Sequence, residues 1–309
     1  MTDRPLFRIG TRGSPLATAQ TLEARDRLAA AVPALAGAGA MEVVEIKTSG
    51  DAILDRPLAE VGGKGLFTKE LDAALLDGRI DIAVHSVKDV ETFLPDGVVL
   101  AACLEREDPR DAFLSLKAPS LAELLAGSVV GSASLRRQAQ ILNRRPDLKV
   151  TLIRGNVQTR LAKLADGACD ATVLAVAGLN RLGMAEKASA VLSPEEMLPA
   201  VGQGAIGITC RADDTAALEF LAAVDHAESH IRVRAERALL AALDGSCRTP
   251  IGGLAEISGS RLRLRGLVAK ADGSAMYETE REGALADAEA LGDDAGRELR
   301  ARAGDDLFA

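Results

Sequence analysis

One of the four cysteines lies in a polar segment beside a cation. Cys247 is followed directly by Arg248, whereas Cys103 and Cys210 lie in apolar runs and Cys169 precedes an apolar run. A neighbouring cation lowers the pKa of a thiol and raises the fraction of thiolate. Cys247 is therefore the best candidate nucleophile. The alternative, an exposed thiol without a role, stays open on sequence context alone.

A lysine and an aspartate follow the apolar run 80–84. Lys88 and Asp89 come at the end of the segment that begins with that run. A carboxylate in this position is suited to shuttle protons or to stabilise a cation that develops on a substrate. The alternative is an aspartate that caps a turn, which is a common use of this residue.

Several arginines recur in or just after predicted strand-end loops. They are Arg12, Arg136, Arg137, Arg154, Arg160 and Arg181. Guanidinium groups pair with carboxylates in a bidentate manner and stay charged at all relevant pH values. Helix N-termini such as that at Ser134 add backbone donors for anions. The recurring placement predicts a small substrate with several negative groups, although any one of these arginines alone is equally consistent with a solvated helix residue.

The elements that position these residues alternate between strand and helix through the first 210 residues. Strands are predicted at 6–9, 41–47, 80–84, 129–131, 150–153 and 171–176. Ser14 is a predicted N-cap with Pro15 at the first position of a helix that runs to about Ala31. Strand, loop and helix in succession predict parallel sheets, whose ligands bind outside the carboxyl ends of the strands. No internal repeat is visible in the sequence.

Two short segments, 105–109 and 198–204, have the composition of interdomain connections and bracket a middle lobe. Beyond them, a helix at 227–243, strand-like runs at 251–257, 262–269 and 276–282, and a final helix near 286–301 indicate a small α+β domain. The predicted domains are therefore 1–104 with 201–221, then 105–200, and then 222–309.

Composition narrows the function classes. The chain has 309 residues with 48% hydrophobic residues, so a disordered protein is excluded. Aromatic residues make up 2% and the formal net charge is −8, which argues against nucleic acid as a partner. The start of the sequence has no apolar signal segment and no run of about 18 apolar residues occurs. We therefore expect a soluble, cytoplasmic protein without a membrane partner.

Metal and nucleotide motifs are weak. His226 and His230 are spaced to share one helix face, but no supporting ligand motif accompanies them, so no metal site is predicted. The segment 62–65 lacks the P-loop pattern. It fits a flexible loop over a cleft about as well as an ordinary surface turn.

Read together and in order, eight segments resemble the porphobilinogen deaminase (hydroxymethylbilane synthase) family. The segments are TRGSPLA at 11–17, VGGKGLF at 61–67, DIAVHSVKD at 81–89, SLRR at 134–137, LIRGNV at 152–157, LAVAGL at 174–179, LPAVGQGA at 198–205 and GSC at 245–247. Each piece alone is weak, but the ordered set covers nearly the whole chain and is highly specific.

The resemblance implies an α/β fold with two lobes like those of periplasmic binding proteins, which have mixed, mainly parallel sheets, and a small α+β C-terminal domain. It implies a dipyrromethane cofactor joined by a thioether to Cys247, with Asp89 and Lys88 in catalysis. Lys88, Asp89, Ser134, Arg136 and Arg137 would hold the cofactor. The substrate would contact Arg12, Ser14, Gln20, Phe67, Thr92, Arg154, Arg160, Arg181 and Gln203.

The implied reaction deaminates four porphobilinogen molecules and joins them head to tail into hydroxymethylbilane, in tetrapyrrole (haem or chlorophyll) biosynthesis. Each substrate loses ammonia to give an electrophilic azafulvene, whose positive charge Asp89 stabilises. The resemblance also implies a monomer that hands its product to uroporphyrinogen-III synthase.

One position departs from the family pattern, and two other functions compete. Glu91 stands where the family often has proline, which loosens the turn and adds a carboxylate beside the predicted site. A non-catalytic binding protein of the same fold would explain the arginines but gives Cys247 and Asp89 no joint role. A cysteine hydrolase would need a base near the thiol, and the three histidines offer no identifiable partner.

Overall fold

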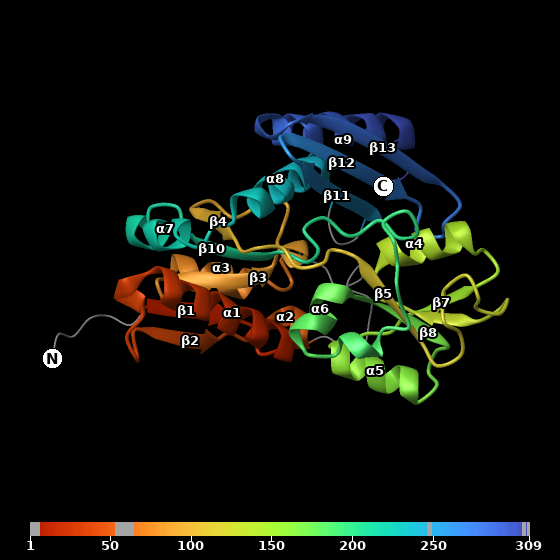
Figure 1. Ribbon diagram of the computed structural model, residues 1–309, viewed down its shortest axis with the longest axis horizontal. Helices are drawn as coiled ribbons and strands as arrows, with labels where there is room; N and C mark the ends of the chain where they lie inside the picture. The colour runs from red at the N-terminus through yellow and green to blue at the C-terminus, as the bar shows by residue number, and fades with distance from the viewer. Residues whose placement is uncertain (1–6, 53–64, 246–248, 305–306, 308–309) are drawn as a thin grey trace. The chain divides into compact units, whose positions relative to one another are not determined.

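The computed structural model describes residues 7–52, 65–245, 249–304 and 307 (Figure 1). These residues form two compact units. The first holds the described residues of 7–52, 65–106 and 205–230, and the second holds 107–204 together with the described residues from 231 onward.

The first unit contains a five-stranded sheet. Its strands are β1 (Phe7–Thr11), β2 (Met41–Glu45), β3 (Ile82–Ser86), β4 (Val98–Cys103) and β10 (Ile206–Arg211), in the order β2-β1-β3-β10-β4. Strand β10 runs antiparallel to both of its neighbours, so the other four strands share one direction.

Three helices of the first unit pack on this sheet: α1 (Pro15–Ala31), α3 (Lys69–Leu76) and α7 (Thr215–Ala222). The unit also contains the short helix α2 (Ser49–Ala52) and the 3-10 turns η1 (Pro33–Leu35) and η2 (Val87–Asp89). One hydrophobic cluster joins Leu28 of α1 and Leu221 of α7 to strand residues such as Ile208. A second cluster packs Leu71 and Leu75 of α3 against the sheet. The burial of strand residues by helices is typical of α/β sheets.

The second unit repeats the plan of the first. Its larger sheet consists of β5 (Asp111–Ser115), β6 (Val129–Gly131), β7 (Lys149–Thr151), β8 (Ala171–Ala175) and β9 (Ala190–Val191), in the order β7-β6-β8-β5-β9. Here β5 is the antiparallel strand, in the place that β10 takes in the first sheet. The two sheets therefore have equivalent strand orders, with the antiparallel strand in the fourth position of each. This confirms the predicted lobes of periplasmic-binding-protein type, with mixed and mainly parallel sheets.

Three helices of the second unit follow strands of its larger sheet, and polar side chains cap two of them. They are α4 (Leu135–Arg144), α5 (Val157–Ala165) and α6 (Val176–Arg181), followed by η3 (Ala185–Lys187). Ser134 caps α4 by accepting a hydrogen bond from the backbone of Arg137, and Asn156 caps α5 in the same way through Thr159. Such caps satisfy backbone N–H groups that have no partner within the helix.

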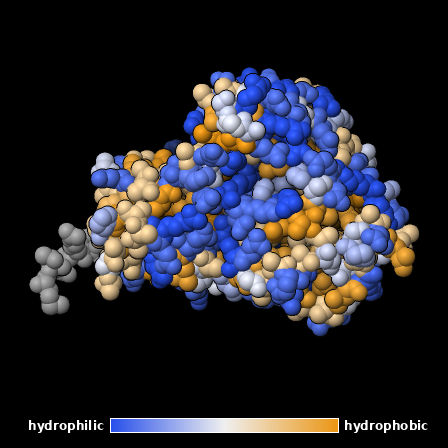
Figure 2. Space-filling model, in the orientation of Figure 1, coloured by the Kyte–Doolittle hydropathy of each residue, from blue (hydrophilic) through white to orange (hydrophobic). Residues whose placement is uncertain are grey.

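The C-terminal part of the second unit is a small α+β domain. Its antiparallel sheet consists of β11 (Ile251–Ser258), β12 (Arg261–Ala269) and β13 (Met276–Ala284). The sheet is accompanied by η4 (Leu285–Asp287), by the helix α9 (Ala288–Ala303) and by the part of α8 (Ala227–Ala242) from residue 231 onward. Gly292 lets α9 approach α8 closely, because a Cβ atom there would lie 2.2 Å from the carbonyl oxygen of Ala235. Hydrophilic side chains predominate on the visible face of this domain, at the top of the view (Figure 2). The predicted α+β domain is confirmed.

The C-terminal domain contacts the larger sheet's domain through α4, which lies beside the C-terminal sheet in Figure 1. Gln138 donates to the carbonyl oxygen of Ala271 at 3.0 Å, and Asn143 donates to that of Gly273 at 2.9 Å. These contacts explain why the two parts cluster as one unit.

The first predicted connection contains the boundary between the units at 106/107, and the second ends at the boundary at 204/205. The backbone N–H of Glu107 donates to the carbonyl oxygen of Gly204 at 3.3 Å. Gly204 has a φ of +89°, and a Cβ atom there would lie 2.4 Å from the carbonyl oxygen of Glu107. The close passage of the two chain segments therefore requires glycine.

Throughout the part of the chain that the structure describes, no helix combines the length and the apolar character that crossing a membrane requires.

Candidate functional site

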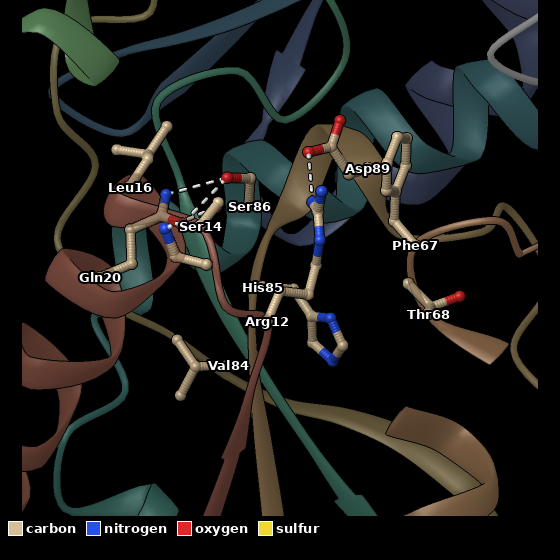
Figure 3. A pocket seen from close by; sticks show the side chains of 11 residues that line it. Arg12, Ser14, Leu16, Gln20, Phe67, Thr68, Val84, His85, Ser86 and Asp89 are labelled. Atoms are coloured by element: carbon tan, nitrogen blue, oxygen red, sulfur yellow. Dashed lines mark hydrogen bonds and ion pairs between the residues drawn. The ribbon is translucent and has the colours of Figure 1, made fainter. Parts of the chain in front are cut away.

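A pocket in the first unit gathers five of the predicted site residues (Figure 3). It is lined by Arg12, Ser14, Leu16, Ala17, Gln20, Phe67, Thr68, Val84, His85, Ser86 and Asp89. Its walls come from the carboxyl ends of β1 and β3 and from the start of α1, which is where ligands bind in sheets of this kind.

Ser14 has a structural task at this pocket. Its hydroxyl accepts a hydrogen bond from the backbone N–H of Ala17 at 3.3 Å, and Pro15 follows at the first position of α1. The predicted cap is confirmed. The helix N-terminus at the pocket favours anions, because its backbone N–H groups carry a partial positive charge.

Arg12 lies between an aromatic ring and a carboxylate. Its Cζ atom is 4.1 Å from the centroid of the Phe67 ring, and its Nη1 is 3.9 Å from Oδ2 of Asp89. The side chain of Asp89 remains 34% exposed. A long ion pair and partial exposure leave this carboxylate accessible to a ligand, as chemistry at Asp89 would require.

His85 lies beneath Arg12 in Figure 3 and is buried. Its Nε2 is 3.0 Å from the hydroxyl oxygen of Thr209 on β10. Burial, and secondarily the charge of Arg12, lower the pKa of His85 to about 4. The imidazole is therefore neutral near pH 7 and adds no positive charge to the pocket.

Gln20 forms a reciprocal pair with Ser86. The amide nitrogen of Gln20 lies 2.9 Å from the hydroxyl of Ser86, which in turn is 3.1 Å from the amide oxygen. Gln20 is 4% exposed, so most of its surface is covered by protein. The pair joins α1 to the end of β3 and holds the two walls of the pocket together.

Glu91, which departs from the family pattern, accepts a hydrogen bond from the backbone N–H of Gly65. Nearby on α3, Asp72 is 4% exposed. Burial raises the pKa of Asp72 to about 6, and the charge of Glu91 adds to that increase. Lys88 belongs to η2 beside Asp89, and Thr92 follows Glu91.

In the second unit, Arg136 and Arg137 converge on a residue that the sequence analysis did not single out. Nη2 of Arg136 is 2.8 Å from Oδ2 of Asp111, and Nη2 of Arg137 is 2.7 Å from Oδ1. The two arginines are 4% and 5% exposed, and Asp111 is fully buried. Burial alone would raise the pKa of Asp111, but the two guanidinium charges and the hydrogen bonds hold it far below its usual value.

Gln203 joins this cluster. Its amide nitrogen donates to Oδ1 of Asp111 at 2.9 Å and to the carbonyl oxygen of Pro109 at 2.7 Å. Gln203 is among the residues predicted from the sequence and Asp111 is not, because Asp111 lies just beyond the segment 105–109 that is interpreted as a connection. An acidic residue at the start of an otherwise apolar strand was the available signal.

The remaining predicted arginines also lie in the second unit. Arg154 follows β7 and is 7% exposed. Nε of Arg160 donates to the carbonyl oxygen of Gly155 at 2.8 Å, and Nη1 of Arg181 donates to that of Gly204 at 3.2 Å. Arg160 and Arg181 therefore each have a backbone contact near a strand end or a chain connection.

The three cysteines that the structure describes lie in apolar surroundings, as predicted for them. Cys103, Cys169 and Cys210 are buried, and burial raises the pKa of Cys169 and raises that of Cys210 to about 11. Such thiols are poor nucleophiles. Cys247 lies outside the described residues.

The two helical histidines have protein partners instead of a shared ligand. Nδ1 of His226 is 2.8 Å from the hydroxyl of Ser229, and Nδ1 of His230 is 2.9 Å from Oδ1 of Asp225. Within the described ranges, no group of three or more His, Cys, Asp or Glu side chains is arranged to hold a metal ion.

The fold and the pocket define an α/β protein with an arginine and an accessible carboxylate side by side at the carboxyl ends of its strands. The family model described as "Porphobilinogen deaminase, dipyromethane cofactor binding domain" matches residues 7–219, and the model of the C-terminal domain of porphobilinogen deaminase matches residues 230–301. The chain belongs to the porphobilinogen deaminase family. Membership confirms the predicted enzyme class, a transferase of tetrapyrrole synthesis with a dipyrromethane cofactor.

Named relatives agree across nearly the whole chain. The porphobilinogen deaminase of Nitrobacter hamburgensis is 59% identical over 98% of this chain and 95% of its own length. The chloroplastic porphobilinogen deaminase of Oryza sativa is also 59% identical, over 98% of this chain and 86% of its own length. Among solved structures, the methionine-binding protein MetQ matches 72% of this chain and 91% of its own, with a TM-score of 0.46 and 16% identity.

Proposed function

We propose that this chain deaminates four porphobilinogen molecules and joins them head to tail into hydroxymethylbilane, on a dipyrromethane linked through a thioether to Cys247. The observation that supports the residue roles best is the accessible Asp89 carboxylate beside Arg12, in a pocket that also contains Phe67. A binding protein would have no need of an exposed carboxylate next to its anion-binding arginine.

The second unit fits a cofactor that carries carboxylates. Arg136 and Arg137 bring two positive charges to one negative charge on Asp111, and Nε of Arg136 is buried without a hydrogen-bond partner among the described residues. A carboxylate would compensate the remaining charge and satisfy that donor. We assign Arg136 and Arg137, with Lys88 and Ser134, to the cofactor.

When bound, the dipyrromethane supplies a free pyrrole carbon that accepts the first substrate ring and an anchor that retains the growing product. Asp89 stabilises the positive charge that develops on a substrate as its aminomethyl group leaves as ammonia. The same carboxylate accepts or returns a proton at Oδ1 or Oδ2. His85, which lies beneath Arg12, is neutral near pH 7. Arg12 is therefore the only positive group among the residues that line this pocket.

The substrate's acetate and propionate groups are bound by cationic and polar side chains. We assign this role to Arg12, Ser14, Gln20, Phe67, Thr92, Arg154, Arg160, Arg181 and Gln203. The Arg12 guanidinium on the face of Phe67 is held in place by a cation–π contact, which limits its rotamers before the substrate arrives.

Further features of the protein follow from the same proposal. We infer the domains 1–104 with 201–221, 105–200 and 222–309, a monomeric state, a cytoplasmic location and transfer of product to uroporphyrinogen-III synthase. Fractionation of cells tests the location, since some relatives are named chloroplastic. Light scattering after size exclusion tests the monomer.

The intact mass of the purified protein, beside a Cys247→Ala variant, tests the function. We expect a native mass that exceeds the sequence mass by two linked pyrroles and an unmodified mass for Cys247→Ala. Cys169→Ala, a change at a buried thiol, is the matched control and should keep the additional mass. If the native protein stays unmodified even after incubation with porphobilinogen, the proposal is wrong and a non-catalytic binding protein replaces it.

A further inference from the structure

Asp111 lies at the centre of a buried cluster that connects three separate parts of the second unit. It is the first residue of β5, the arginines come from α4, and Gln203 precedes the chain crossing at 204/205. Oδ1 accepts from Nε of Arg137 at 3.2 Å and from its Nη2 at 2.7 Å, while Oδ2 accepts from Arg136. Both oxygens of this carboxylate are therefore engaged.

Each guanidinium also donates a hydrogen bond to a backbone carbonyl oxygen through a nitrogen that does not contact Asp111. Nη1 of Arg136 donates to the carbonyl oxygen of Leu198 at 2.7 Å, and Nη1 of Arg137 donates to that of Val173 at 2.9 Å. With Asp111 on one side and a carbonyl on the other, neither guanidinium is able to rotate without breaking a buried hydrogen bond. Such a loss is costly in a buried setting.

Stability alone does not explain this arrangement. Buried ion clusters are often no more stable than apolar residues of similar volume, because burying each charge is expensive. Here two cations meet a single carboxylate, so the cluster keeps one uncompensated positive charge. Its Arg136 Nε also lacks a hydrogen-bond partner among the described residues. These features suit a site that is completed by an anion.

We infer that Asp111 is a positioning residue: it fixes the directions of Arg136 and Arg137 and leaves them one net positive charge for a cofactor carboxylate. This inference rests on the proposed function, in which these two arginines hold the dipyrromethane. Asp111 contacts the arginines and leaves contact with the cofactor to them.

The test measures how fast the cofactor assembles on the full chain. The cofactor-free fraction of Asp111→Asn and of the unaltered protein is incubated with porphobilinogen, and the two-pyrrole mass is followed by intact mass spectrometry. Because the change removes charged hydrogen bonds that orient both guanidiniums, we expect assembly to slow by roughly tenfold or more. Asp108→Asn is the matched control, since Asp108 pairs with Arg110 and lies outside the cluster.

A second control separates positioning from stability. Leu148→Ala removes a buried side chain from the same lobe, at a residue whose backbone N–H bonds to the carbonyl oxygen of Arg145 and not to the cluster. If Leu148→Ala, at a similar loss of thermal stability, slows assembly as much as Asp111→Asn does, the inference is wrong. Assembly by Asp111→Asn at the rate of Asp108→Asn would contradict it as well.

If Asp111→Asn does not fold, Asp111→Glu answers the question. Glutamate keeps the charge but moves the carboxylate by one methylene, so the guanidiniums shift and assembly should still slow by several-fold. Assembly at the unaltered rate would show that only the charge matters and would overturn the inference. If the unaltered protein never gains the two-pyrrole mass, the proposed function fails, and the inference about Asp111 fails only as its consequence.

Discussion

Two aspartates, Asp89 and Asp111, face arginines in the two units, and they differ in distance and in burial. Asp89 is 34% exposed and lies 3.9 Å from Arg12. Asp111 is fully buried and holds two arginines at 2.7 and 2.8 Å. The first carboxylate is open to a ligand, while the second is committed to protein partners. The residue type is the same in both places, so the environment alone makes one aspartate accessible and the other inaccessible.

The position of each aspartate on its sheet explains the difference. Asp89 follows β3 in the turn η2, beyond the carboxyl end of a buried strand. Asp111 is the first residue of β5, the antiparallel strand of the second sheet, and its side chain is covered by α4. A residue beyond a strand end is open to a ligand, and a residue within the sheet packs against its neighbours.

The largest expected difference is in catalysis. Asp89→Asn should lower kcat by about 10²–10⁴-fold, the usual range for a positioned proton-transfer or charge-stabilising group. Its free energy of unfolding should change by less than about 1 kcal/mol, because the pair with Arg12 is long and partly exposed. Steady-state kinetics and urea denaturation measure the two effects. A large loss of stability with retained turnover would reverse the roles assigned to the two aspartates.

The largest expected effect on stability belongs to Asp111. Asp111→Asn should lower the free energy of unfolding by about 3–5 kcal/mol, because two guanidinium charges lose their buried partner. Urea denaturation of this variant is compared with Asp108→Asn, which breaks a more exposed ion pair and should cost about 1 kcal/mol or less. Equal losses in the two variants would remove the contrast between buried and exposed pairs.

His85, in the pocket that contains Asp89, predicts that the stability of the folded protein depends on pH. Its pKa is about 4 in the folded protein against 6.5 for the free side chain, so the unfolded chain binds more protons between these values. Stability should therefore fall as the pH drops from 7 to 4, by up to about 3 kcal/mol from this group. His85→Gln should flatten that part of the profile, measured as urea midpoints at several pH values. An unchanged profile would show that His85 does not titrate in this range.

The smallest expected effect concerns Asp72, whose contribution to stability changes with pH in the opposite direction to that of His85. Burial raises the pKa of Asp72 to about 6 from 3.8, so the folded protein binds more protons between these values and loses that contribution as the pH rises. Asp72→Asn should therefore increase stability at pH 8 by about 2 kcal/mol and by less at pH 4. Asp77→Asn, at a carboxylate that is 65% exposed, is the control and should change stability little. A destabilised Asp72→Asn at pH 8 would indicate that the charged carboxylate has a favourable partner.

Local signals in the sequence predicted much of this protein. Ser14 with Pro15 predicted the start of α1, and hydrophobic runs predicted the strands of the C-terminal domain. These features are predictable because a helix cap and the periodicity of a strand depend only on residues a few positions apart in the sequence. The repeated plan of the two larger sheets left no trace as a sequence repeat, because strand order is set by packing and permits different side chains.

By itself, the sequence determined the family, the order of the chemical motifs, the caps and the identity of the residues that carry charge. Only the tertiary structure decided how those charges are used. Asp111 meets Arg136, Arg137 and Gln203 across 25, 26 and 92 residues of sequence, and Gln20 meets Ser86 across 66. Burial and distance change the energy of an ion pair several-fold, and both are properties of packing that no local pattern contains.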